Sequence, residues 1–184
     1  MKTKNKEGIN RAIITLLFLS YLIVLLWVVV FKCNVNSQLN IERNLARPLW
    51  DRFTDRIIPF IDIYYMFIGK MSFYNILAFF FNPIVCVPGG ILLGFFVKLR
   101  RGLLYSFFFI LGIEVFQLFS GWGGFEPTDV IMNLLGVLFG YLIHNALYRV
   151  MSAKAINTVA LYTLCIAAPF AVFVVIRTVL NFPV

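Results

Sequence analysis

The chain has 184 residues, of which 61% are hydrophobic and 13% are charged. A soluble domain of this length could not bury so much apolar surface, so the composition indicates one integral membrane domain. The formal net charge of +8 alone would suit a nucleic-acid-binding protein. However, basic residues are concentrated in short segments between apolar runs, which is the pattern that orients membrane proteins, so no nucleic-acid partner is expected.

The amino-terminal part predicts a basic tail at residues 1–11 and a first membrane span at residues 12–31. The tail carries four basic residues against one acid. The apolar run that follows is unbroken and about long enough to cross a bilayer. A cleaved signal peptide is the alternative interpretation. The run is too long for a typical signal core and no A-x-A site follows it, so an uncleaved anchor is expected.

Residues 32–71 are the longest region rich in polar side chains and are expected to form an outer loop. Within it, residues 47–60 read RPLWDRFTDRIIPF and mix arginines with aromatic side chains. Such a segment would lie in the membrane interface, with its charges in water. Alternatively, it is a solvated loop in which acids and arginines pair locally.

The second span is expected at about residues 73–97. Residues 60–97 are too many for one straight span and too few for two, so their path stays open. Pro83 and Pro88 each remove a backbone donor, and the span is therefore predicted to be kinked or broken. Lys98, Arg100 and Arg101 follow as a short basic cluster that belongs in the cytoplasm.

Three more spans are predicted at residues 103–119, 127–147 and 156–180. The third and fourth are joined by a Gly-rich turn at residues 121–126, and Pro127 suits the first turn of a helix. With the amino terminus in the cytoplasm, nine basic residues lie in short cytoplasmic segments. The predicted fold is an all-α membrane protein with about five transmembrane helices and an external carboxyl terminus.

Polar side chains gather at the outer ends of these predicted spans. Glu114 and Gln117 share one face of the third span, while Asp129 and Asn133 begin a stripe on the fourth that continues through glycines. Ionisable groups inside spans are costly and usually point to function. The sequence therefore predicts a polar ligand-binding pocket open toward the outer leaflet, formed by Asn82, Glu114, Gln117, Asp129, Asn133 and Arg177.

Each of these residues also has a structural explanation. Amides in helix interfaces hydrogen-bond neighbouring helices, and Gly136 with Gly140 forms a GxxxG that favours close helix packing over ligand binding. Arg177 would snorkel to the interface or pair with an acid of the pocket. For Glu114 and Asp129 together, function is favoured, because two carboxylates near one site cost more than a scaffold requires.

No metal site or cofactor is expected. The three cysteines show neither CxxC nor Cys/His metal spacing, and their odd number with two inside apolar runs argues for inert thiols. His144 is the single histidine and lies late in an apolar helix, where a satisfied or interfacial histidine is the favoured interpretation.

An ordered set of short motifs resembles the VanZ-like family of small bacterial membrane proteins, named for a teicoplanin-resistance accessory protein. The motifs are IIPF at residues 57–60, Asn82 with Pro88 and Gly90, Glu114-x-x-Gln117, Asp129-x-x-x-Asn133-x-x-Gly136, and Gly140. The resemblance covers roughly residues 12–150 and leaves residues 156–180 as an additional C-terminal helix. It implies a multi-pass protein of the bacterial cytoplasmic membrane, in some members lowering susceptibility to lipoglycopeptides, and it supplies no established reaction.

The chain departs from the family pattern at two places. The family often carries an arginine a few residues before the aspartate, where residues 121–124 here read GWGG. If that arginine helps to bind an anionic group, Arg177 or the loop arginines would substitute for it, or the ligand differs. Cys86 occupies a position that is usually aromatic.

Three functions compete at this stage. The leading hypothesis is an envelope protein without demonstrated enzymatic activity that binds a lipid-linked cell-wall precursor, a membrane lipid or a lipoglycopeptide and contributes to teicoplanin tolerance. A second is a membrane enzyme that modifies a lipid headgroup with Glu114 and Asp129 as acid and base. The sequence offers it no Ser/His/Asp set and no phosphate-cradling loop. A third is a structural subunit of a membrane complex; the oligomeric state stays open.

Overall fold

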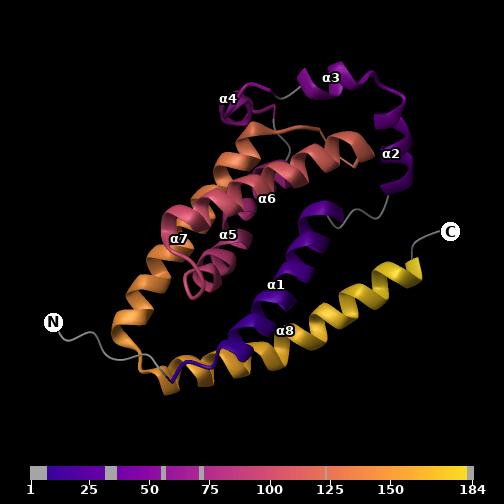
Figure 1. The fold of residues 1–184 in the computed structure, drawn as a ribbon. Helices are drawn as coiled ribbons and strands as arrows, with labels where there is room; N and C mark the ends of the chain where they lie inside the picture. Colours follow the sequence, from indigo (N-terminus) through magenta and orange to yellow (C-terminus); the bar gives the residue numbers. More distant parts are fainter. Residues whose placement is uncertain (1–7, 32–36, 55–56, 71–72, 123, 182–184) are drawn as a thin grey trace.

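The computed structural model describes residues 8–31, 37–54, 57–70, 73–122 and 124–181. Their secondary structure is helical, which confirms the predicted all-α class (Figure 1). The helices are α1 (Arg11–Phe31), α2 (Ser37–Leu45), α3 (Leu49–Thr54), α4 (Ile61–Phe67), α5 (Phe73–Leu93), α6 (Leu99–Ser120), α7 (Pro127–Val150) and α8 (Ala153–Asn181).

Four of these helices are long and apolar enough to cross a membrane, namely α1, α6, α7 and α8. They correspond to the first, third, fourth and fifth predicted spans, so the chain is a multi-pass membrane protein. The apolar part of α5, Phe79–Leu93, is shorter. The second predicted crossing therefore has a helix at the expected place, while its passage through the bilayer stays a prediction.

Helices α5 and α7 form the closest pair in the structure. A Cβ atom added to Gly136 would overlap the carbonyl oxygen of Pro83, and one added to Gly140 would overlap that of Val87. Gly90 of α5 meets the carbonyl oxygen of Val137 in the same way. Small residues allow such close backbone contact between transmembrane helices, so the packing interpretation of the GxxxG is confirmed.

The predicted break in the second span is wrong. Helix α5 is continuous and contains both Pro83 and Pro88. The physical reason is its contact with α7, because a neighbouring helix that covers the backbone lets a transmembrane helix tolerate proline. Whether α5 bends at the prolines stays a prediction.

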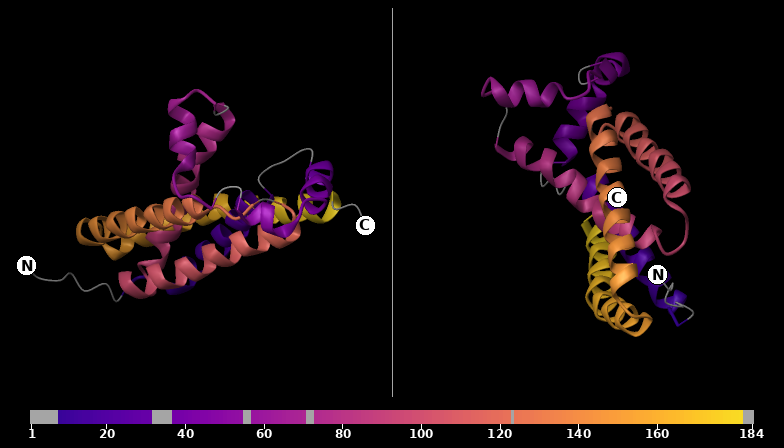
Figure 2. Two further views of the ribbon diagram at one scale, coloured as in Figure 1. Left: turned by 90° about the horizontal axis from the view of Figure 1, so that it is seen from above. Right: turned by 90° about the vertical axis from the view of Figure 1, so that its left-hand side faces the viewer.

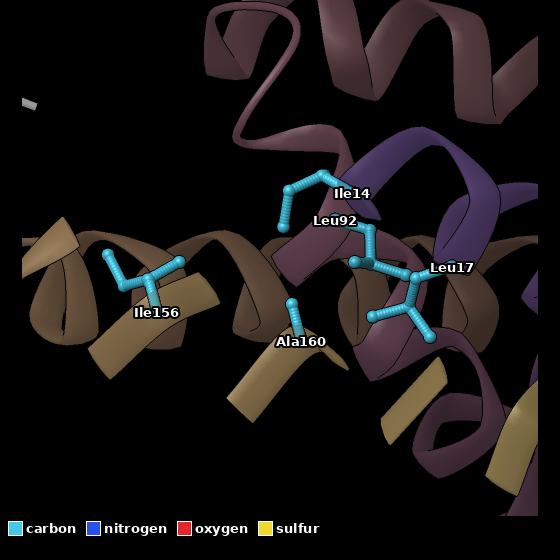
Figure 3. Close-up of a cluster of buried hydrophobic side chains, with 5 residues drawn as sticks. All are labelled: Ile14, Leu17, Leu92, Ile156 and Ala160. Carbon is cyan, nitrogen blue, oxygen red and sulfur yellow. The ribbon is translucent and has the colours of Figure 1, made fainter. Parts of the chain in front are cut away.

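Helices α1 and α8 form a second pair, which joins the rest of the bundle through α5. Ile14 and Leu17 of α1, Leu92 of α5, and Ile156 and Ala160 of α8 make a buried apolar cluster (Figure 3). The start of α8 is also tied to the residues before α1, since the Asn157 amide donates to the Gly8 carbonyl over 2.7 Å.

The two ends of the bundle differ. The end where α6 stops and α7 begins also carries α2, α3 and α4 (Figure 1), while α4 and the first part of α5 project from the layer of the other helices (Figure 2). This end is termed the outer end, after the orientation that the charges predict. The opposite end, where α5 leads into α6 and α7 leads into α8, is termed the inner end.

The turn between α6 and α7 has the predicted chemistry. Gly121 ends α6 in the left-handed conformation, with φ of 76°, which glycine adopts without strain. Glu126 precedes α7 in an extended conformation, and Pro127 occupies the first turn of the helix as expected. The turn thus delivers the first residues of α7 beside the end of α6.

Candidate functional site

Four of the predicted site residues lie buried at the outer end. Glu114 and Gln117 belong to the last two turns of α6, and Asp129 and Asn133 to the first two turns of α7. Their exposed fractions range from 0% for Gln117 to 8% for Asp129. Such burial of two carboxylates and two amides in an apolar bundle requires polar partners.

Helix α5 supplies partners for the α7 side chains. The Asn82 amide donates to Asp129 Oδ1 over 2.8 Å, and the Cys86 thiol donates to Asn133 Oδ1 over 3.4 Å. Both pairs are separated by 47 residues, so α5 and α7 run in the same direction with a constant register. The structure therefore brings Asn82, Asp129 and Asn133 together along one helix interface.

Glu114 contacts the beginning of α7 from the side of α6. Its Oε2 accepts a hydrogen bond from the backbone N–H of Glu126 over 3.1 Å. Asp129 lies in the first turn of the same helix. Unpaired N–H groups and the helix dipole favour negative charge at a helix N-terminus. The start of α7 therefore stabilises both the Glu114 and the Asp129 carboxylate.

The outer loop folds over this cluster. We define the outer cap as α2, α3, α4 and the described residues between them. The Asn44 amide donates to the Gly121 carbonyl over 2.8 Å, and the backbone N–H of Phe60 donates to Thr128 Oγ1 over 2.8 Å. The Phe53 ring also packs against Phe125, with 5.4 Å between the ring centroids. The cap is therefore attached to both sides of the α6–α7 turn.

Arg52 is the buried charge of the cap. Its Nη1 donates to the Leu118 carbonyl in the last turn of α6 over 2.6 Å. A cation is favourable at a helix C-terminus, where carbonyl groups lack partners within the helix. Its Nε is buried and has no hydrogen-bond partner in the part of the chain that the structure describes. Arg52 thus retains an unused donor at the outer end.

The structure differs from the predicted open pocket in one respect. The loop expected to lie in the interface or in water instead covers the polar groups, which explains why they are closed off from the outer leaflet. A ligand that reaches them would have to displace the cap.

Arg177 stays untested as a member of the site. It belongs to the last turns of α8, and the placement of its side chain lies outside what the structure describes. Sequence reasoning had named Arg52 and the other loop arginines only as possible substitutes for the missing family arginine. The sequence analysis did not name Thr128, because a threonine near a helix start usually indicates only local capping. In the structure its buried hydroxyl oxygen accepts a hydrogen bond from the Phe60 N–H of the cap.

An apolar groove runs between α6 and α7 beyond the polar cluster. It has a volume of about 390 Å³ and is lined by Leu103, Phe107, Ile131, Leu134, Leu135 and Leu138. Ile131 follows Asp129 by two residues and therefore lies about 3 Å further along α7 but on another side of the helix, since Asp129 faces α5 and the groove faces α6. Within the described residues, no group of three or more metal-ligating side chains is present.

Comparison with known proteins agrees with the resemblance noted in the sequence. A family model described as VanZ/LLP1 matches residues 18–151, which is more than half of the chain. The matched range contains the outer cap, α5, α6 and α7, and it excludes all of α8. No curated protein and no solved structure matches the chain.

Proposed function

The chain belongs to the VanZ/LLP1 family, and from this premise we propose that it is a cell-envelope protein that binds an amphiphilic ligand at the outer end of its bundle. The ligand class is a lipid-linked cell-wall precursor or a lipoglycopeptide, and the consequence of binding is teicoplanin tolerance. The observation that carries the proposal is the buried cluster in which Asn82 donates to Asp129 beneath the outer cap.

Helix packing alone does not account for this cluster. The close approach of α5 and α7 is achieved by glycines at positions 90, 136 and 140, which need no polar neighbours. Each ionisable group in a span costs roughly 3 kcal/mol on insertion scales. Glu114 and Asp129 add this cost although the glycines already provide the helix packing. A ligand explains their presence better than packing does.

The chemistry of the cluster favours a headgroup rich in hydrogen-bond donors. Ionised carboxylates only accept hydrogen bonds, so Glu114 and Asp129 suit hydroxyl, amide N–H or ammonium groups. Arg52 adds a buried Nε donor that suits a phosphate or carboxylate. A lipid-linked sugar or peptide carries both kinds of group, whereas a simple anionic lipid offers few donors.

The apolar groove suits the other half of such a ligand. Its six lining side chains are apolar, and it lies on the side of α7 that faces α6, just below the first turn of the helix. An alkyl chain in this groove would gain contact with α6 and α7, and its headgroup would pass the start of α7 to reach the acid cluster. The distribution of polar and apolar surface thus matches an amphiphile better than a water-soluble ligand.

Entry of the headgroup requires the outer cap to open. The hydrogen bonds that hold it involve Asn44, Arg52 and Phe60. Each is worth about 1 kcal/mol net, and the bond from the arginine about 2 kcal/mol. A cap held by contacts of this size can exchange between closed and open states on the time scale of ligand binding.

The test compares teicoplanin susceptibility of cells that make the wild-type chain, Glu114→Gln, Asp129→Asn or the control Glu42→Gln at matched membrane levels. Glu42 is an exposed carboxylate of α2, so its variant has the same loss of charge outside the cluster. The expected result is that wild type and control protect, while both cluster variants do not.

Three other outcomes contradict the proposal in different ways. Equal protection by all four chains means that the buried acids are structural. If the Glu42→Gln control loses as much protection as the two cluster variants, the loss reflects the change in net charge and not the cluster. If wild type gives no protection, teicoplanin tolerance is not the function of this chain, and headgroup turnover by the purified protein becomes the next measurement.

A further inference from the structure

Helix α4 and the residues just before it present an exposed apolar surface at the outer end of the bundle. We define the α4 surface as Ile58, Phe60, Tyr64, Tyr65, Phe67 and Ile68, whose exposed fractions range from 38% for Phe60 to 86% for Phe67. Residues 57–69 contain a single charged residue, Asp62. Among the helices that the structure describes, α4 has no extensive packing partner. An exposed apolar surface of this kind marks contact with a protein or with a membrane.

One hydrogen bond sets the level of α4 relative to the membrane spans. The backbone N–H of Phe60, the N-cap residue of α4, donates to Thr128 Oγ1 over 2.8 Å. Thr128 lies in the first turn of α7, a helix of 24 residues that is therefore about 36 Å long. The hydrocarbon core of a bilayer is about 30 Å thick, so the first turn of α7 lies close to the outer boundary of this core. Helix α4 begins at the same level.

From this starting point α4 runs across the spans and not along them. In both views of Figure 2, α4 lies across the direction of α7 and projects sideways from the layer of the long helices. The turn into α4 is made at Phe60, whose φ of 61° is in the left-handed region that residues with a Cβ atom rarely adopt. Because the long helices cross the membrane, a segment that lies across them at this level extends along the membrane surface.

The side chains of α4 have the chemistry of the membrane interface. Tyr64 and Tyr65 are both exposed, and each combines an apolar ring with a hydroxyl group that requires a polar partner. Tyrosine is enriched where acyl chains meet headgroups for this reason. Lys70 is exposed directly after the helix, where its long side chain can place the ammonium group among the headgroups. Phe67 has no polar group and suits the acyl chains.

The exposed apolar character continues from α4 into the next helix. Phe80, Phe81 and Ile84 of α5 are between 51% and 60% exposed, although α5 packs closely against α7 through Gly90. A bilayer covers such an extended apolar surface without requiring a complementary shape. A protein partner instead requires a bounded patch with a polar rim, which one charged residue in positions 57–69 does not provide. The lipid bilayer is therefore the favoured partner of the α4 surface.

We propose that the α4 surface is an interfacial membrane anchor that binds the phospholipids of the outer leaflet. Helix α4 lies along the boundary between headgroups and acyl chains, with its apolar side chains among the acyl chains and the tyrosine hydroxyls and Lys70 at the headgroups. The anchor attaches the α4 end of the outer cap to the bilayer, in addition to its hydrogen bond with α7. This inference is independent of which ligand the outer cluster binds.

The test measures the membrane depth of nitroxide spin labels on the full-length chain in phospholipid vesicles. The labels are attached at Tyr64→Cys or Phe67→Cys in α4, at the control Glu42→Cys, which is an exposed position of α2, or at the reference Phe139→Cys, which is exposed halfway along α7. The background carries Cys33→Ser and Cys165→Ala and keeps Cys86, which is buried. Collision rates with oxygen, which concentrates in lipid, and with a nickel chelate, which stays in water, give the depth of each label.

The expected result is an intermediate depth for both labels on α4. They should lie about 5–10 Å into the boundary between headgroups and acyl chains, which is the depth at which interfacial helices are buried. The label at position 139 should lie deeper than both. The label at position 42 should collide more often with the nickel chelate than with oxygen, because α2 is on the water side of the cap.

Three results would overturn the proposal. If the label at position 67 is as accessible to the nickel chelate as the label at position 42, α4 lies in water. A depth equal to that at position 139 would mean that α4 inserts into the hydrocarbon core and is not interfacial. Protection of the α4 labels from both reagents would show that protein covers this surface, and spin–spin broadening between copies would then identify a second copy of the chain as the partner.

Discussion

Replacing Asp129 by asparagine separates the charge of the outer cluster from its hydrogen bonding. Asparagine has the shape of aspartate and keeps a carbonyl oxygen where Asp129 Oδ1 accepts from the Asn82 amide at 2.8 Å. The variant therefore retains this contact between α5 and α7. What it removes is the negative charge in the first turn of α7.

The expected loss of stability is small. Favourable interaction of an acid with a helix N-terminus is worth about 0.3–1 kcal/mol, and up to about 2 kcal/mol where the group is partly buried. Removing the costly buried charge offsets part of this loss. We therefore expect the free energy of unfolding to fall by about 1 kcal/mol or less. Asp129→Ala, which also removes the acceptor for Asn82, should lose about 1–3 kcal/mol.

The assay is SDS titration of the purified variants in mixed micelles, with tryptophan fluorescence as the signal, alongside antibiotic susceptibility of the same variants in cells. Loss of tolerance in Asp129→Asn with nearly unchanged stability would assign the carboxylate to ligand binding. A loss of more than about 3 kcal/mol in this variant would refute the reasoning, because the charge itself would then hold the bundle together.

Three further predictions address the packing and the cap. Gly140→Leu should destabilise the bundle by about 3 kcal/mol or more in the same SDS titration, because its Cβ already overlaps α5 backbone, while Gly112→Leu, with open space around it, should be nearly neutral. Arg52→Gln should abolish tolerance while lowering the free energy of unfolding by about 2 kcal/mol; full tolerance would remove Arg52 from the site. Thr128→Val should accelerate hydrogen exchange in the peptide that contains Phe60 by about five-fold, and unchanged exchange would mean that this bond does not hold the cap.

The spans were predictable because their signal is local. Long apolar runs with basic residues at their ends identify transmembrane helices from composition alone, and four of the five predicted spans are confirmed. The α6–α7 turn was predictable for the same reason, since Gly121 and Pro127 each have a conformational preference that suits one position of a helix end. The parallel direction of α5 and α7 followed from the number of crossings between them.

A break in α5 was predicted because the helix-breaking tendency of proline can be read from the local sequence. The helix packing that compensates for it involves residues far away in the chain and cannot be read there. The sequence shows Pro83 and Pro88, but the covering contact comes from Gly136 and Gly140, about fifty residues later in the chain. Whether a proline interrupts a helix in a membrane depends on such neighbours, and no pattern around the proline itself reports them.

The cap was missed for a related reason. Residues 47–60 have the composition of an interfacial or solvated loop, and Trp50, which is 70% exposed, behaves that way. Arg52, two residues later, is buried against the end of α6. The difference depends on the carbonyl groups at the end of a helix that lies 66 residues further on, which only the folded chain brings within reach.

The shared register of α5 and α7 explains how this helix pair can carry a buried polar cluster at one end. Asn82 meets Asp129 at the outer end, and Gly90 meets Val137 in the middle of the same interface. Because backbone contact in the middle fixes the pair, neither end has to supply the packing. The outer end is then free to hold buried carboxylates, at an energetic cost that packing elsewhere offsets. On this reasoning, substitutions at the glycines should disturb the outer cluster together with the helix pair, whereas a substitution at Asp129 should affect the cluster and leave the pairing of α5 with α7 intact.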